Sequence, residues 1–71
     1  MADIKCEIKK TFGVISEGKY TRELNLVSWN NRRELYDLRG WRENHTECSK
    51  GITLNKEELL ALKNILNSME I

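Results

Sequence analysis

The hydrophobic pattern of this chain changes once, from a two-residue period to a helical period, and that change limits the folds it can adopt. Apolar residues alternate along much of 3–41, which is typical of half-buried strands. From Leu59 to Met69 they recur at helical spacing on one wide stripe. Asn55 precedes this stripe as a predicted N-cap, and Glu58 completes a capping box. We expect three segments in order: strands over about 3–41, a loop over 42–50 and a helix over about 56–69.

Four antiparallel strands are predicted before the loop. Turn residues separate them, such as Asn30 and Asn31, which tolerate positive φ. Gly13 lies inside the second strand, where a glycine often marks a β-bulge. The predicted strands are Asp3–Lys9, Thr11–Glu17, Thr21–Trp29 and Glu34–Trp41. With the helix packed across one face of this sheet, residues 1–71 form a single domain of the α+β class.

The two tryptophans are predicted to lie on the sheet face opposite the core. Leu24 and Leu26 are taken as core-facing, so Trp29 points to the other side, and Trp41 shares its face with Arg39. An exposed sheet face that carries indoles beside guanidinium groups suits single-stranded nucleic acid, because bases stack on indoles and phosphates pair with cations. The alternative is that either tryptophan is the edge of a small core.

Charge is divided unevenly between the two parts of the chain. The formal net charge of the 71 residues is only +1. Residues 1–42 carry nine basic and six acidic groups, giving +3, whereas residues 43–71 carry three basic and five acidic groups, giving −2. The strand part is therefore basic, and this distribution favours an anionic ligand more than the sum does.

Several classes of protein find no support in the sequence. No apolar run approaches the ~20 residues of a membrane span, and the first residues lack the apolar core of a secretory signal peptide. Cys6 and Cys48 are expected to be free intracellular thiols, and together with His45 they are too few for structural zinc. The sequence contains neither a phosphate-binding glycine loop nor a nucleophile–base pair, so no motif in it indicates an enzyme. We expect no cofactor, no metal, no small-molecule substrate and a cytoplasmic location.

The short length favours association. A chain near 60 residues buries only about 60% of its unfolded surface, and small domains therefore rely on disulfides, metals or oligomerisation. Because neither a disulfide nor a metal is expected, a second copy of the chain is the predicted source of additional stability.

Two motifs resemble a known family. YDLRGW at 36–41 and SKGITLN at 49–55 resemble the positive cofactor four family of transcriptional coactivators, and the chain is most similar to its short bacterial branch, the YdbC-like proteins. The similarity extends from about Ile4 to Leu66. The resemblance implies a strongly curved four-stranded antiparallel sheet followed by a helix. It also implies a homodimer that binds single-stranded DNA on its concave sheet faces with little sequence preference.

The resemblance also implies binding residues, by their positions in the motifs. The closest matches are Trp29, Arg39, Trp41 and Lys50. Further candidates lie in turns that align loosely with the family, namely Lys19, Arg22, Arg32 and Arg33. We therefore expect a DNA-binding protein of transcription, replication or repair, associated with the nucleoid if the chain is bacterial. Two alternatives stay open: a protein-interaction or dimerisation module, and a single-stranded RNA binder, because stacking and phosphate contacts do not read the sugar.

Overall fold

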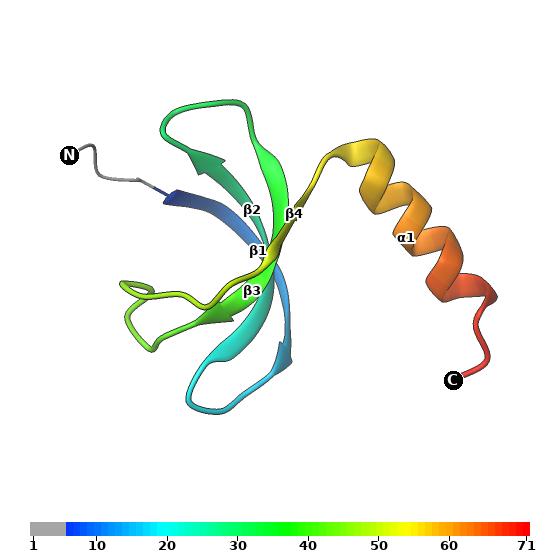
Figure 1. Ribbon diagram of the computed structural model, residues 1–71, viewed down its shortest axis with the longest axis horizontal. Coiled ribbons are helices and arrows are strands. Elements are labelled where there is room, and N and C mark those ends of the chain that lie inside the picture. The colour runs from blue at the N-terminus through cyan, green and yellow to red at the C-terminus, as the bar shows by residue number, and fades with distance from the viewer. Residues whose placement is uncertain (1–5) are drawn as a thin grey trace.

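The computed structural model describes residues 6–71, which form one open sheet followed by one helix (Figure 1). The elements are β1 (Cys6–Ser16), β2 (Thr21–Trp29), β3 (Leu35–Trp41), β4 (Ile52–Leu54) and α1 (Lys56–Ser68). Each strand pairs antiparallel with the next, in the order β1-β2-β3-β4. This arrangement confirms the predicted α+β class and the four-stranded sheet. The helix α1 is too short and too polar to cross a membrane.

β1 is one long strand where the sequence pattern predicts two. It joins the predicted strands Asp3–Lys9 and Thr11–Glu17, of which positions 3–5 lie outside the described residues. The register along β2 shifts three times: between Ile8 and Lys10, between Thr11 and Gly13, and between Val14 and Ser16. Each shift interrupts the two-residue period, which is why the sequence pattern indicated two separate strands. One of the shifts lies at Gly13, the position where a bulge was expected. Extra residues bend a strand and increase its twist, so β1 curves the sheet.

The fourth strand lies after the loop rather than before it. The prediction placed four strands within 3–41, but β4 comprises only Ile52–Leu54, paired with β3. Three residues show no readable period, so only the pairing identifies this strand. It leads directly into α1, whose capping box is as predicted. The Asn55 Oδ1 atom accepts a hydrogen bond from the Glu58 amide at 2.8 Å, and the Asn55 amide donates to Glu58 Oε1 at 2.9 Å.

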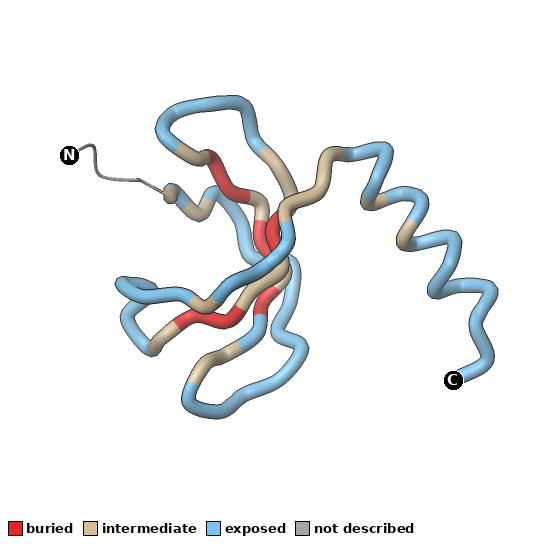
Figure 2. The backbone as a smooth tube through the Cα atoms, viewed as in Figure 1, coloured by how far each residue is buried: buried red, intermediate tan, exposed pale blue. Residues whose placement is uncertain are grey.

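The buried side of the sheet is the side that was predicted to be exposed. Cross-strand pairs such as Asn25 with Asp37 put alternate residues of β2 and β3 on one face. We call this the inner face, and its members include Glu23, Asn25, Val27, Trp29, Leu35, Asp37, Arg39 and Trp41. Five of these are buried, and Trp29, Leu35 and Arg39 are half-buried (Figure 2). The sequence pattern assigned the two faces the wrong way round because Asn25 and Asp37 are polar. In the structure, both residues have no exposed surface.

The opposite side of the sheet is largely uncovered. Leu24 and Leu26, the predicted core residues, lie on this outer face together with Tyr36 and Leu38, and all four are only half-buried. The expectation that the helix packs across a face is also wrong for the described chain. None of the residues of α1 is buried, and the helix leads away from the sheet after β4 (Figures 1 and 2). The helix therefore leaves the outer face only half-buried and keeps much of its own apolar stripe exposed.

Candidate functional site

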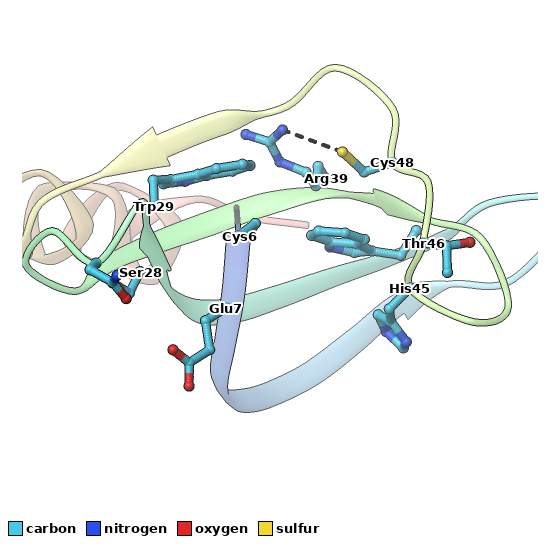
Figure 3. A pocket seen from close by; sticks show the side chains of 10 residues that line it. Cys6, Glu7, Ser28, Trp29, Arg39, His45, Thr46 and Cys48 are labelled. Carbon is cyan, nitrogen blue, oxygen red and sulfur yellow. Dashed lines mark hydrogen bonds between the residues drawn. The ribbon is translucent and has the colours of Figure 1, made fainter. Parts of the chain in front are cut away.

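A groove of about 870 Å³ lies at one end of the inner face, which is within the size range of ligand sites. It is built by the start of β1, the end of β2, the far half of β3 and the loop that follows β3. The residues of its lining that matter most are Cys6, Trp29, Arg39, Trp41, His45 and Cys48 (Figure 3). Residues from four separate segments therefore converge on one hollow.

A guanidinium group stacked on an indole occupies the middle of this groove. The Arg39 Cζ atom lies 4.8 Å from the centroid of the Trp29 ring, which is a cation–π contact. Arg39 is held in place because its Nε donates to Asp37 Oδ1 at 2.6 Å. The other oxygen of Asp37, Oδ2, accepts a hydrogen bond from Thr53 Oγ1 at 3.1 Å. β4 thus supports the carboxylate that positions the arginine.

Arg39 keeps its charge in spite of its partly buried position. Burial lowers the pKa of Arg39, but the hydrogen bonds and charges of Asp37 and Cys48 outweigh it, so the pKa rises above its usual value. The guanidinium is therefore a permanent cation with a fixed orientation. A planar cation of this kind stacks on aromatic rings and also pairs with phosphate.

A second buried carboxylate fastens the loop after β3 to the inner face. The Glu23 side chain is almost fully buried, and the His45 Nε2 atom lies 3.0 and 3.1 Å from its two oxygens. Asn25 Nδ2 also donates to Glu23 Oε1, at 3.1 Å. The backbone of His45 is in the left-handed region, with φ of 55°, and its ring lies 5.6 Å from that of Trp41. The loop therefore folds back over the sheet and forms one wall of the groove.

The returning arm of the same loop brings Cys48 to Arg39. Cys48 forms an antiparallel bridge with Trp41, and the Ser49 amide donates to the Gly40 carbonyl at 2.8 Å. In the other direction, the Gly40 amide donates to Ser49 Oγ at 2.9 Å. These contacts fix the exposed Cys48 thiol, whose Sγ accepts a hydrogen bond from Arg39 Nη1 at 3.8 Å. Figure 3 shows the guanidinium between the Trp29 ring and this sulfur.

Close packing of two backbone segments explains why the SKGITLN motif has a glycine at position 51. A Cβ atom at this position would collide with Arg39 Cβ and with the carbonyl of Leu38. Only glycine therefore lets the chain after Lys50 pass close to β3 and pair as β4. The close approach keeps Thr53 within hydrogen-bonding distance of Asp37, and through Asp37 it supports Arg39.

The groove brings together three of the eight predicted binding residues, Trp29, Arg39 and Trp41. Trp29 is half-buried and keeps accessible ring surface, whereas Trp41 is only 4% exposed. The core-edge alternative therefore describes Trp41, and the stacking alternative fits Trp29.

The other five predicted residues lie outside this lining. Arg32 and Lys50 are exposed in segments next to the groove, after Trp29 and after Cys48 respectively. Arg33 lines a smaller hollow beside the start of α1, and Lys19 lines another with Arg42. Arg22 is exposed and alternates along β2 with the inner-face residues. The structure thus does not gather these cations into one cluster.

Cys6, His45 and Cys48 also line the groove but were not among the predicted binding residues. The two cysteines were expected to be free thiols, and together with His45 they were considered too few for a structural zinc site. Among residues 6–71, no group of three or more His, Cys, Asp or Glu side chains is placed to hold a metal ion. The available signal was the loop itself, because a polar connection of about nine residues exceeds the usual 4–6 and is often functional.

Comparisons with known proteins agree with this architecture. Residues 16–65 match the family described as Transcriptional Coactivator p15 (PC4). An uncharacterized protein of Treponema pallidum (strain Nichols) is 37% identical over 71 residues, which span 97% of this chain and 84% of the relative. The family match includes β2, β3, the loop and β4, and therefore contains Trp29, Arg39 and Cys48.

Proposed function

Because this chain belongs to the Transcriptional Coactivator p15 (PC4) family, we propose that it binds single-stranded DNA in the groove of the inner face, as a homodimer and with little sequence preference. The observation that carries this proposal is the stack of Arg39 on Trp29, which combines a fixed cation with an aromatic platform in one groove. Single-strand binding sites combine these two elements, because each nucleotide has a base to stack and a phosphate to neutralise.

In this proposal Trp29 and Arg39 act on the bases and Trp41 supports them. A base stacks on the accessible surface of the Trp29 ring or on the guanidinium plane of Arg39. Trp41 is too deeply buried to offer a stacking surface, so we assign it the structural role of backing the groove. Arg32 and Lys50 are the exposed cations nearest in sequence to groove residues, and we propose that they contact the phosphates.

The buried carboxylates of the inner face do not oppose an anionic ligand. Asp37 is paired with Arg39, and Glu23 is hydrogen-bonded by Asn25 and contacted by His45. Both carboxylates therefore have partners within the chain. Repulsion of phosphates is reduced accordingly, and the stacked pair of Arg39 and Trp29 dominates the groove.

The proposed dimer rests on the apolar surface that one chain leaves uncovered. Large apolar side chains of the helical stripe, Ile65 and Leu66 of α1 and Met69 at its C-cap, are 48–55% exposed. The outer face of the sheet is also only half-buried. Contiguous exposed apolar surface of this kind marks a protein interface, and a second copy of the chain offers a matching surface.

Titration of labelled oligo-dT against the native chain at rising salt concentration tests the proposed function. If about four phosphates per chain are contacted, affinity falls roughly fiftyfold between 50 and 200 mM salt. A parallel titration with oligo-U distinguishes DNA from RNA as the preferred ligand. Absence of binding at low salt, or equally tight binding of duplex DNA, contradicts the proposal.

Exchange of each tryptophan for alanine separates the two roles. Trp29→Ala removes the stacking platform, so affinity for oligo-dT is expected to fall by about 1–3 kcal/mol, roughly 5- to 150-fold. Its midpoint of unfolding in urea changes little. Trp41→Ala removes a buried side chain and is expected to cost about 3–5 kcal/mol of stability. If Trp29→Ala instead unfolds the chain, Trp29 is a core residue and the stacking role is wrong.

The exposed stripe of α1 supports one alternative, a module that binds another protein. Under this alternative the stripe takes up a different partner in place of a second copy. A partner that is retained after nuclease treatment, together with no binding of either oligonucleotide, favours this function. The cytoplasmic or nucleoid location and the process served stay predictions.

A further inference from the structure

We propose that Arg42 and Lys19 form an additional contact for the single strand, in the hollow between the β1–β2 turn and the start of the loop after β3. This hollow takes up one nucleotide beyond those in the groove. The phosphate of that nucleotide lies between the two cations, and its base stacks on the Arg42 guanidinium. The inference rests on the proposed function and extends it to a second position on the molecule.

The Arg42 guanidinium is held in the same way as that of Arg39. Its Cζ atom lies 5.3 Å from the centroid of the Tyr20 ring, and its Nε donates to Glu47 Oε2 at 3.2 Å. In the groove, Arg39 has the corresponding contacts with an indole at 4.8 Å and a carboxylate at 2.6 Å. Among the described residues, no partner engages the Nη atoms of Arg42, so they are available to a phosphate.

Tyr20, the ring beneath Arg42, packs directly on the backbone of β3. A Cβ atom at Gly40 would lie 2.8 Å from Tyr20 Cβ and 3.5 Å from its Cγ. The glycine therefore lets the half-buried tyrosine approach the strand, and this packing holds the ring in place. Arg42 stacks on a ring that is itself fixed, which makes Tyr20 a positioning residue.

The hollow beside this stack has the charge that an anionic ligand requires. Its volume is about 340 Å³, and its lining consists of Gly18, Lys19, Thr21, Arg42 and Glu43. Two cations thus face one carboxylate, so the lining carries a net positive charge and attracts a phosphate. Glu43 is the one group of this lining that opposes the ligand.

The hollow continues the inner face beyond the groove. Thr21 lines the hollow and pairs across the sheet with Trp41, which lines the groove. Figure 1 shows the two connections that build the hollow on the side of the sheet away from α1. Arg39 and Arg42 are three positions apart, which is about 10 Å of extended chain. A strand that leaves the groove therefore reaches the hollow, since single-strand sites without sequence preference cover several nucleotides.

Titration of the full-length chain with oligo-dT of increasing length tests the additional contact. Arg42→Gln and Lys19→Gln are each expected to weaken binding of long oligonucleotides roughly 3- to 10-fold at 50 mM salt. The slope of log affinity against log salt concentration becomes shallower by about 0.7, the value for one phosphate. The shortest oligo-dT that binds the native chain occupies the groove alone, and its affinity is unchanged.

Lys10→Gln is the matched control for this titration. Its ammonium lies 5.3 Å from the centroid of the Phe12 ring, so it also removes an exposed cation from an aromatic ring, but outside the hollow. Affinity is expected to stay unchanged at every length. Equal weakening by Lys10→Gln and Arg42→Gln, or equal weakening of short and long oligonucleotides by Arg42→Gln, overturns the proposal.

Glu43→Gln is expected to act in the opposite direction. It removes the opposing carboxylate of the hollow and raises affinity for long oligo-dT roughly two- to fivefold. Damage to the fold does not produce a gain of affinity. Glu70→Gln removes an exposed carboxylate after α1 and leaves affinity unchanged. An equal gain from both exchanges shows a general effect of net charge and contradicts a contact in the hollow.

Exchanges of Tyr20 test its positioning role. Tyr20→Ala is expected to weaken binding of long oligo-dT only, and Tyr20→Phe, which keeps the ring beneath Arg42, restores the native affinity. If the midpoint of unfolding in urea shows that Tyr20→Ala damages the fold, the result with Arg42→Gln decides. Loss of affinity in Tyr20→Phe shows that the ring does not act through Arg42.

The outcomes also separate this inference from the function on which it rests. If the native chain binds no oligo-dT of any length, the proposed function fails and the additional contact fails with it. If the native chain binds and Arg42→Gln matches it at every length, the proposed function stands and the additional contact is wrong.

Discussion

The inner and outer faces of the sheet differ in chemistry and in the partners that their side chains find within one chain. On the inner face, the buried carboxylates of Glu23 and Asp37 have hydrogen-bonding partners within the described chain. On the outer face, apolar side chains such as Leu24 and Leu26 remain half-exposed, and α1 does not cover them. Two buried polar atoms of the inner face, Asn25 Oδ1 and Trp41 Nε1, still lack a hydrogen-bond partner among the described residues. Under the proposed function, the inner face receives the ligand and the open apolar face meets a second copy of the chain, so recognition and association fall on opposite sides of the sheet.

Loss of Asp37 is expected to have the largest effect, because it dismantles the inner face. Asp37→Ala leaves the partly buried Arg39 without its ion-pair partner and also removes the acceptor of Thr53. Breaking a buried pair from one side costs about 3–5 kcal/mol. Urea denaturation at fixed protein concentration measures the change. Glu47→Ala is the control, since it removes an exposed carboxylate paired with Arg42 and costs at most about 1 kcal/mol. Equal losses for both variants contradict a special role of the inner-face pair.

A charge on the apolar stripe of α1 is expected to weaken the proposed dimer and to leave the inner face intact. Leu66→Glu places a carboxylate on the exposed apolar stripe and weakens the proposed dimer at least about tenfold, because the charge must be desolvated on association. Light scattering coupled to size-exclusion chromatography measures the mass at several concentrations. Asn67→Glu adds the same charge on the polar side of the helix and leaves the mass unchanged. If both variants stay dimeric, the stripe is not the interface between the copies.

The smallest expected effect is at Asn55, where the sheet ends and α1 begins. Asn55→Ala removes the side-chain cap of α1 and costs about 1 kcal/mol of helix stability. Amide hydrogen exchange is expected to accelerate in the first turn of α1 and to stay unchanged in β2 and β3. Asn55→Ser keeps a capping oxygen and restores most of the protection. Equal acceleration across the sheet shows instead that helix and sheet unfold as one unit.

The elements with a complete local signal were predicted well from the sequence. β2 has the predicted bounds, and β3 and α1 differ from the predicted ones by a single residue at one end. The capping box of Asn55 and Glu58 is present with both hydrogen bonds. These features depend on residues that are neighbours in the sequence, so they can be predicted without knowing the tertiary structure. The DNA-binding roles of individual residues stay predictions.

What could not be predicted depends on partners far apart in the chain. β4 is a strand only because it pairs with β3, and Gly51 permits that approach. Asn25 and Asp37 read as surface residues, yet cross-strand pairing and hydrogen bonds bury them. Cys48 meets Arg39 only because the loop returns along Trp41. The polarity of a residue in one strand does not reveal which groups on other segments will form hydrogen bonds with it.

The irregular register of β1 has a consequence for how the protein behaves at high concentration. β1 is an edge of the sheet, and eleven residues with a free row of backbone groups would form a template for pairing with a foreign strand. Its three register shifts interrupt that row, and Lys9 and Lys10 place charges beside the first of them. Bulges and edge lysines are the devices that discourage edge-to-edge aggregation. The bends in β1 that curve the sheet thus also guard its longest open edge against amyloid-like growth.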